Sequence, residues 1–297
     1  MTSTHDHGQH DRQHQHGHAG HAGHADGEGM TDLLDLDGEV LHGYWTAALD
    51  WVRDATAGSG PARSLLDLGA GTGTGALGLA ARFPGATVAA VDIEPDSLRR
   101  LAERAGELDL AERVRPVQAD LDAGWPDLGP LDLTWASMSL HHMADPGAVL
   151  AWVLAATRDG GLIAVAEFPE PLRFLPADLG VGPAGFEERV TADLSQAHAE
   201  QMPTLGSAWA PRLADAGWQV TAERTFAIDL SRPAGPRAGQ YARAWFARLA
   251  AGFADRLDAT DQATLAALLD PQGPHSLLHR TDLHIRGTRI LTLGRRG

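Results

Sequence analysis

The residues best placed to do chemistry lie in one short run, Leu65–Gly75. Asp67 ends an apolar stretch, and Gly69, Gly71 and Gly73 follow it at alternate positions. Glycines in such a turn permit unusual φ values and let a ligand press against the backbone. The helix that should follow begins with free N–H donors. The pattern predicts a nucleotide-like ligand at the carboxyl edge of a parallel sheet.

This pattern alone does not identify the ligand. Gly71, Gly73 and Ala76 have the spacing of the dinucleotide-binding fingerprint. Asp92, at the end of the next expected strand, would hold ribose hydroxyls in either case, because a carboxylate offers two acceptor oxygens. An NAD-type oxidoreductase is therefore one hypothesis. Another is a non-catalytic cofactor- or metal-binding protein that uses the histidine-rich N-terminus.

The longer run Asp67–Gly73 is more discriminating, because it resembles motif I of class I S-adenosylmethionine-dependent methyltransferases. The resemblance continues in order through residues 64–168, in the segments Ala90–Ile93, Gln118–Leu121, Ser139–Pro146 and Arg158–Leu162. The Ser139–Pro146 loop resembles that of small-molecule enzymes of the ubiquinone-biosynthesis type. The resemblance implies S-adenosyl-L-methionine as cofactor and transfer of its methyl group to O, N or C of a small molecule.

The resemblance also implies a set of cofactor-binding residues at the strand ends and on the helix before them. They are Tyr44, Asp67, Gly69, Ala70, Gly71, Gly73, Asp92, Ile93, Asp120, Leu121 and Ala136. Asp67 would reach the amino group of the methionine part, and Asp92 would accept both ribose hydroxyls. Ile93 and Leu121 would enclose the adenine, and Asp120 would accept from its amino group. The alternative is that the three aspartates only cap the next elements.

Three further residues are candidates for catalysis. His141 and His142 fall where substrate should meet the methyl group, and a neutral imidazole there could take a proton from the acceptor. Glu167 ends the fifth expected strand. Structural roles for all three are the alternative. Tyr44 and Trp45 would close over the sulfonium by cation–π attraction, or simply pack in the core.

Strands alternating with helices over residues 64–166 predict an α/β, Rossmann-like and mostly parallel seven-stranded sheet with helices on both faces. One helix is expected over 39–56, and the segments 186–201 and 237–269 look helical. The connections 169–206 and 231–282 are long, and we expect them to form a helical lid over one pocket.

The lid should supply aromatic walls and polar contacts, although the same residues would also suit a solvated face. The candidate walls are Phe174, Phe186, Trp209, Tyr241, Trp245 and Phe246. The candidate polar contacts are Arg243, Arg248, His275, His279 and Arg280.

The amino-acid composition excludes some classes of partner and of chemistry. The formal charge of −15 disfavours nucleic acid as a partner. The absence of cysteine and lysine excludes thiolate and Schiff-base chemistry. There is no apolar run long enough to span a bilayer, and no secretory signal, which together predict a cytoplasmic protein with no membrane partner. Residues 1–29 hold eight histidines between His5 and His24 and are expected to be a disordered tail. Weak Zn²⁺ or Ni²⁺ binding by the tail and a homodimer are left open, with no metal site expected in the 30–297 domain.

Overall fold

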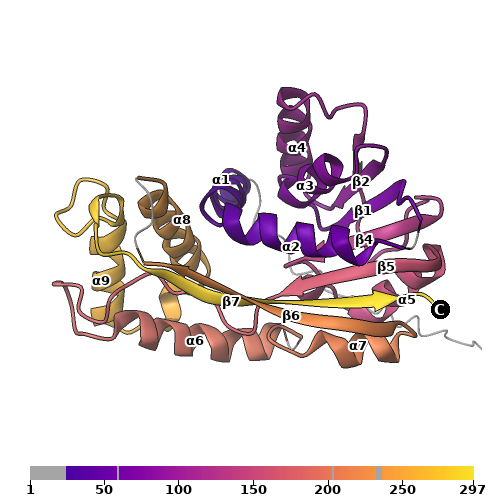
Figure 1. The fold of residues 1–297 in the computed structure, drawn as a ribbon. Helices are drawn as coiled ribbons and strands as arrows, with labels where there is room; N and C mark the ends of the chain where they lie inside the picture. The colour runs from indigo at the N-terminus through magenta and orange to yellow at the C-terminus, as the bar shows by residue number, and fades with distance from the viewer. Residues whose placement is uncertain (1–24, 59, 203, 232–235) are drawn as a thin grey trace, which may run out of the picture.

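The computed structural model describes residues 25–58, 60–202, 204–231 and 236–297 (Figure 1). Short 3-10 turns lie at Leu140–His142, Ala254–Arg256 and Leu277–His279. The described helices are α1 Ala25–Val40, α2 His42–Ala55, α3 Thr74–Arg82, α4 Pro95–Glu107, α5 Pro146–Ala156, α6 Phe186–Gln201, α7 Trp209–Asp215, α8 Pro236–Phe253 and α9 Ala259–Leu269. The strands are β1 Ser64–Leu68, β2 Thr87–Asp92, β3 Val114–Gln118, β4 Leu131–Ser137, β5 Thr157–Glu167, β6 Gln219–Leu230 and β7 Ile285–Arg295.

The strands form one sheet in the order β3-β2-β1-β4-β5-β7-β6. The first five run parallel, whereas β7 pairs antiparallel with both β5 and β6. This confirms the predicted α/β, mostly parallel seven-stranded sheet. A dinucleotide-binding sheet has the order 3-2-1-4-5-6, so the antiparallel β7 between β5 and β6 sets this fold apart from it.

Side chains alternate across the sheet because successive residues of a strand point to opposite faces. Leu65 packs in a cluster with α2, α3 and α4, whereas Leu66 and Leu68 pack with α5 and α7 on the other face. Both faces are therefore covered, as near-continuous apolar strands require. The carboxyl ends of β1, β2 and β4 remain the edge at which loops gather.

The N-terminal region corrects two expectations. The tail was expected to reach residue 29, but α1 already begins at Ala25; residues 1–24 and their histidines lie outside the described residues. One helix was expected over 39–56, but the chain breaks at Leu41, whose ψ of 22° is not helical. Leu41 is buried, so the break lets α1 and α2 pack against different parts of the molecule.

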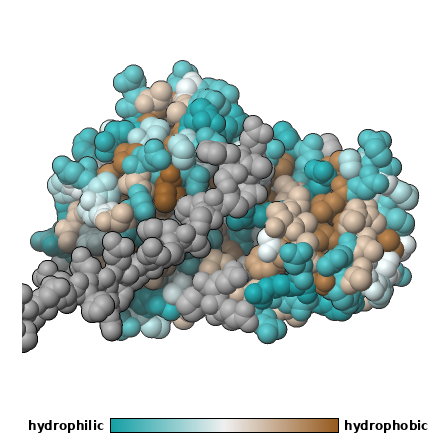
Figure 2. Space-filling model, turned by 180° about the vertical axis from the view of Figure 1, so that it is seen from behind, coloured by the Kyte–Doolittle hydropathy of each residue, from teal (hydrophilic) through white to brown (hydrophobic). Residues whose placement is uncertain are grey.

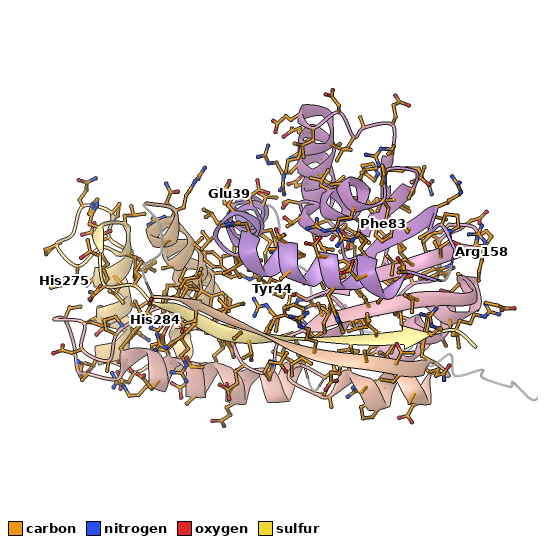
Figure 3. All side chains as sticks on the ribbon, in the orientation of Figure 1. Glu39, Tyr44, Phe83, Arg158, His275 and His284 are labelled. Carbon is orange, nitrogen blue, oxygen red and sulfur yellow. The ribbon has the colours of Figure 1, made fainter. Side chains whose placement is uncertain are left out.

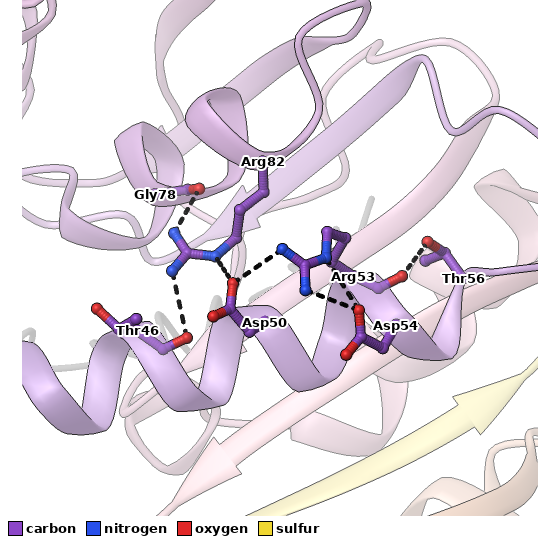
Figure 4. Close-up of polar contacts among 7 residues, drawn as sticks. All are labelled: Thr46, Asp50, Arg53, Asp54, Thr56, Gly78 and Arg82. Atoms are coloured by element: carbon purple, nitrogen blue, oxygen red, sulfur yellow. Dashed lines mark hydrogen bonds and ion pairs between the residues drawn. The ribbon is translucent and has the colours of Figure 1, made fainter.

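Polar contacts join α2 to α3 (Figure 4). Arg82 of α3 donates from Nε to Asp50 at 2.8 Å and from Nη2 to the Thr46 carbonyl at 3.2 Å. Asp50 also accepts from Arg53 at 3.2 Å. Because α2 carries Trp45 toward the carboxyl edge of the sheet, these contacts help to position that side chain.

The two long connections build a lobe on the extended β6–β7 pair (Figure 1). α6, α8 and α9 lie there, with Phe174, Phe186, Tyr241 and Phe246 buried between them. Seen from behind, hydrophobic side chains appear among polar ones on this lobe (Figure 2). Within the described residues, no helix is both long and apolar enough to cross a membrane.

Candidate active site

The turn after β1 needs its glycines. Gly69, Gly71 and Gly73 have φ of +72°, +52° and +90°, a region that side chains with a Cβ seldom adopt. A Cβ on Gly69 would also lie 2.3 Å from Cβ of Ser139, which donates its own hydroxyl to the Leu68 carbonyl at 2.7 Å. The turn is therefore held tightly against the loop after β4.

Asp92, at the end of β2, holds the same turn from the other side. Its Oδ2 accepts the Gly71 N–H at 2.7 Å, and its Oδ1 accepts the Glu94 N–H at 3.0 Å. The predicted ribose-binding carboxylate thus has one backbone donor on each oxygen. Each oxygen has more than one lone pair, so acceptor capacity remains.

Asp67 and Trp135 lie side by side on β1 and β4, as register partners. Asp67 Oδ2 and Trp135 Nε1 are both buried and have no hydrogen-bond partner. Gly75 lies over both: a Cβ there would be 2.7 Å from the carboxylate oxygen and 2.8 Å from the indole nitrogen. Burial raises the pKa of Asp67 to about 7, with the charge of Asp92 adding to the rise and the Ala76 N–H opposing it. Unpartnered buried polar atoms of this kind mark a place where a ligand completes the hydrogen bonding.

One pocket joins this turn to the lobe. Its cavity volume is about 170 Å³, below the usual range for a site that encloses a whole drug-sized ligand. Its lining residues come from α1, α2, the glycine turn, β4, the residue after β5, α8 and β7: Leu33, Leu34, Asp37, Trp45, Asp67, Gly69, Ala70, Gly71, Thr72, Thr74, Gly75, Trp135, Ser137, Met138, Phe168, Tyr241, Trp245 and Arg289.

The pocket contains a charged cluster centred on Asp37. Asp37 accepts the Tyr241 hydroxyl at 2.6 Å and the Trp45 indole N–H at 3.0 Å. Arg289 Nη2 lies 3.8 Å from Asp37, and the guanidinium lies over the Phe168 ring at 5.2 Å from its centroid. Sequence reasoning missed Asp37 and Arg289, because Tyr241 and Arg289 are more than 200 residues from Asp37 along the chain.

The predicted catalytic residues form a buried pair beside the pocket. His141 Nδ1 lies 2.7 Å from Glu167 Oε2, both side chains are 4% exposed, and Glu167 Oε1 has no partner. The His141 ring contacts the edge of Phe168, which lines the pocket. The His142 ring lies 4.1 Å from the His141 ring and is exposed. Neither histidine is itself a lining residue.

The predicted adenine and sulfonium residues are placed as follows. Ile93 is 47% exposed, whereas Leu121 and Ala136 are buried. Asp120 is exposed, and its Oδ1 accepts the Asp122 N–H at 2.9 Å. Tyr44 packs in the core against Phe226, and its neighbour Trp45 lines the pocket instead.

Only part of the predicted lid reaches the pocket. Of the candidate walls, Tyr241 and Trp245 line it, and Phe174 packs behind them. Trp209 packs on the opposite face of the sheet with α5. None of the five candidate polar contacts lines this pocket, and Figure 3 shows His275 in the lobe, far from Tyr44. No described residue of 169–206 lines it either. Among the described residues there is no group of three or more side chains that could hold a metal ion.

Comparison with known proteins agrees with this geometry. Residues 66–163 match the family model described as a methyltransferase domain. The match covers β1 through β5, which includes the glycine turn, Asp92 and the loop with His141.

Curated relatives match over part of their own length. A 27-O-demethylrifamycin SV methyltransferase of Amycolatopsis mediterranei is 34% identical over 48% of this chain and 56% of its own. A malonyl-[acyl-carrier protein] O-methyltransferase of Laribacter hongkongensis is 38% identical over 43% of each. The chain thus spans about half the length of the curated relatives it matches.

Solved structures show the same fold at low identity. A protein of Galdieria sulphuraria, described as a sarcosine dimethylglycine methyltransferase, has a TM-score of 0.50 at 19% identity and covers 84% of this chain and 85% of its own. A protein of Bacillus halodurans, described as a methyltransferase, has a TM-score of 0.50 at 16% identity, over 84% and 99%. This likeness concerns the fold of the methyltransferase domain.

The two tyrosines beside the site provide a matched test of its polar contacts. Tyr241→Phe should lower the free energy of unfolding by about 1–3 kcal/mol, because Asp37 loses a buried hydrogen bond. Tyr44→Phe should be neutral or stabilising, because the Tyr44 hydroxyl is buried without a partner. Urea unfolding of both variants measures the difference. Equal losses would contradict the assigned Asp37 contact.

Proposed function

We propose that this chain is an S-adenosylmethionine-dependent methyltransferase that acts on O, N or C of a small molecule. The observation that carries the proposal is the glycine turn with two unpartnered buried groups, Asp67 and Trp135, at its base. The family match over residues 66–163 supports a methyltransferase over the NAD-type alternative. The antiparallel β7 supports the same choice.

The residues at the carboxyl edge fit the proposed cofactor. Asp67 would accept hydrogen bonds from the amino group of the methionine part, and the backbone of Gly69–Gly73 would lie along it. Asp92 would accept ribose hydroxyls, and exposed Ile93 would gain an apolar cover from the adenine. When bound, S-adenosylmethionine supplies an activated methyl group on a positively charged sulfur.

The chain's own contribution is to align the acceptor and exclude water. Trp45, Phe168, Tyr241 and Trp245 give the pocket aromatic walls beside the glycine turn. Methyl transfer neutralises the sulfonium charge, so a dry pocket favours the reaction, and correct alignment can contribute much of the rate. A pocket walled by side chains of both the sheet edge and α8 suits a small molecule better than a macromolecule.

His141 remains our proposed proton acceptor, with Glu167 orienting its ring through Nδ1. Its Nε2 is then the atom that would take the proton. The ring contacts Phe168 rather than the pocket space, so direct transfer requires the Phe168 side chain to move. An acceptor that is already ionised would not need this step.

Calorimetry tests the cofactor directly. The full chain should bind S-adenosylhomocysteine and show no comparable binding of NAD. Asp92→Ala should weaken S-adenosylhomocysteine by at least about tenfold, or 1.4 kcal/mol, because charged hydrogen bonds are lost. Exposed Asp96→Ala, on the next helix, is the matched control and should leave affinity unchanged. Tight NAD binding would overturn the proposal.

A further inference from the structure

Arg289 is a buried cation whose hydrogen bonding is incomplete. The residue is 6% exposed, it lines the pocket, and its Nη1 is buried with no hydrogen-bond partner. Removing a charged group from water costs several kcal/mol unless hydrogen bonds replace those to water. The nearest carboxylate, Asp37, lies 3.8 Å from the other terminal nitrogen, beyond hydrogen-bond distance.

Asp37 does not need Arg289 as a partner. Its two oxygens already accept the Tyr241 hydroxyl and the Trp45 indole N–H, at 2.6 and 3.0 Å. These neutral donors hold Asp37 to one side of the guanidinium, and Phe168 covers a face of it at 5.2 Å. The buried Nη1 therefore has unused hydrogen-bonding capacity in a residue that lines the pocket. Ser137, another lining residue, has a buried hydroxyl that also lacks a partner.

We propose that Arg289 binds a carboxylate of the methyl acceptor, and that the acceptor is a small aromatic acid. We infer a carboxylate on the ligand because the planar array of N–H donors of the Arg289 guanidinium matches two carboxylate oxygens. The aromatic body follows from the walls, where Trp45, Trp135, Phe168, Tyr241 and Trp245 surround the same space. This proposal rests on the proposed function, which identifies the pocket as the binding site for the methyl acceptor. The cofactor also carries an α-carboxylate, so the test must distinguish binding of the acceptor's carboxylate from binding of the cofactor's.

Benzoate and benzamide are matched probes, because they differ in charge and little in shape. We expect benzoate to bind the protein saturated with S-adenosylhomocysteine at least tenfold more tightly than benzamide. Dissociation constants come from the tryptophan indole resonances of ¹⁵N-labelled protein, titrated with and without S-adenosylhomocysteine. Arg289→Met should remove the preference for benzoate, and Arg289→Lys should retain part of it. Exposed Arg248→Leu, outside the pocket lining, should leave it unchanged.

Each other outcome decides against the proposal. Equal binding of benzoate and benzamide, no binding of benzoate, or a preference that survives in Arg289→Met overturns it. The Lys variant decides the matter if the Met variant does not fold. If Arg289→Met weakens S-adenosylhomocysteine but not 5′-methylthioadenosine, which lacks the amino-acid part, Arg289 binds the cofactor's carboxylate instead. If S-adenosylhomocysteine does not bind the wild type, the proposed function fails, and the titration without it still tests the carboxylate site.

Discussion

Gly69→Ala is expected to abolish binding of S-adenosylhomocysteine and to lower the free energy of unfolding by about 2–5 kcal/mol. Two penalties add at this position. The backbone φ of +72° disfavours any residue with a Cβ, and the new Cβ would lie 2.3 Å from that of Ser139. Because Ser139 is tied to the Leu68 carbonyl, it cannot move away without losing a buried hydrogen bond. The turn must therefore shift, and it forms one wall of the pocket.

Substitutions at two other glycines measure the backbone penalty and the contact penalty separately. Gly58 has a φ of +96° but nothing within 4 Å of its Cβ position, so Gly58→Ala should cost only about 1–2 kcal/mol. Gly43 lies inside α2 with open space around it, so Gly43→Ala should stabilise by up to about 1 kcal/mol. Neither should affect ligand affinity. If Gly69→Ala costs no more than Gly58→Ala in urea unfolding, the contact with Ser139 is not a constraint.

The parts of the fold with strong local patterns could be predicted from the sequence. The helix Phe186–Gln201 has the bounds predicted for the segment 186–201. α1 was missed because it contains three glycines and several aspartates, which form helices poorly. Its contacts are long-range: Asp35 pairs with Arg100 and Arg104 of α4 at 2.8 and 3.0 Å.

The candidate site likewise has one part that a local sequence motif predicts and one part that no local motif predicts. The proposed cofactor side depends on a continuous motif, so Asp67, Gly69 and Gly71 could be named and are found lining one pocket. The proposed acceptor side is assembled from α1, α8 and β7, and Arg289 looks like an ordinary strand residue until Asp37 and Phe168 are placed beside it. No local pattern carries that information.

Asp67→Asn is expected to stabilise the protein at neutral pH and to weaken its cofactor. Burial raises the pKa of Asp67 to about 7, from an ordinary value of 3.8. Between about pH 4 and 7 the Asp67 carboxyl is ionised in the unfolded chain but still protonated in the folded chain. Folding then binds the extra proton, so the free energy of unfolding falls as pH rises through this window. The loss is a few kcal/mol in all, at about 1.4 kcal/mol per pH unit, and the asparagine variant should not show it.

Cofactor binding should have the opposite pH dependence. The ammonium of the methionine part favours an ionised partner, so its binding lowers the pKa of Asp67 and releases a proton near pH 6. S-adenosylhomocysteine affinity should therefore rise between pH 5.5 and 7.5 in the wild type. In Asp67→Asn it should be weaker and flat over that range, because no carboxyl titrates there. The variant also serves as the control for titration of the ligand itself.

Calorimetry in two buffers of different ionisation enthalpy measures the released proton, and urea unfolding at pH 5 and pH 7 measures the stability change. Both experiments test the desolvation of Asp67. Desolvation destabilises the ionised carboxylate when no ligand is bound, and it also makes that carboxylate a strong acceptor for a bound cation. A wild type whose stability does not fall between pH 5 and pH 7 relative to Asp67→Asn would show that Asp67 is already ionised. Proton release that persists in the variant would assign the titration to a group other than Asp67.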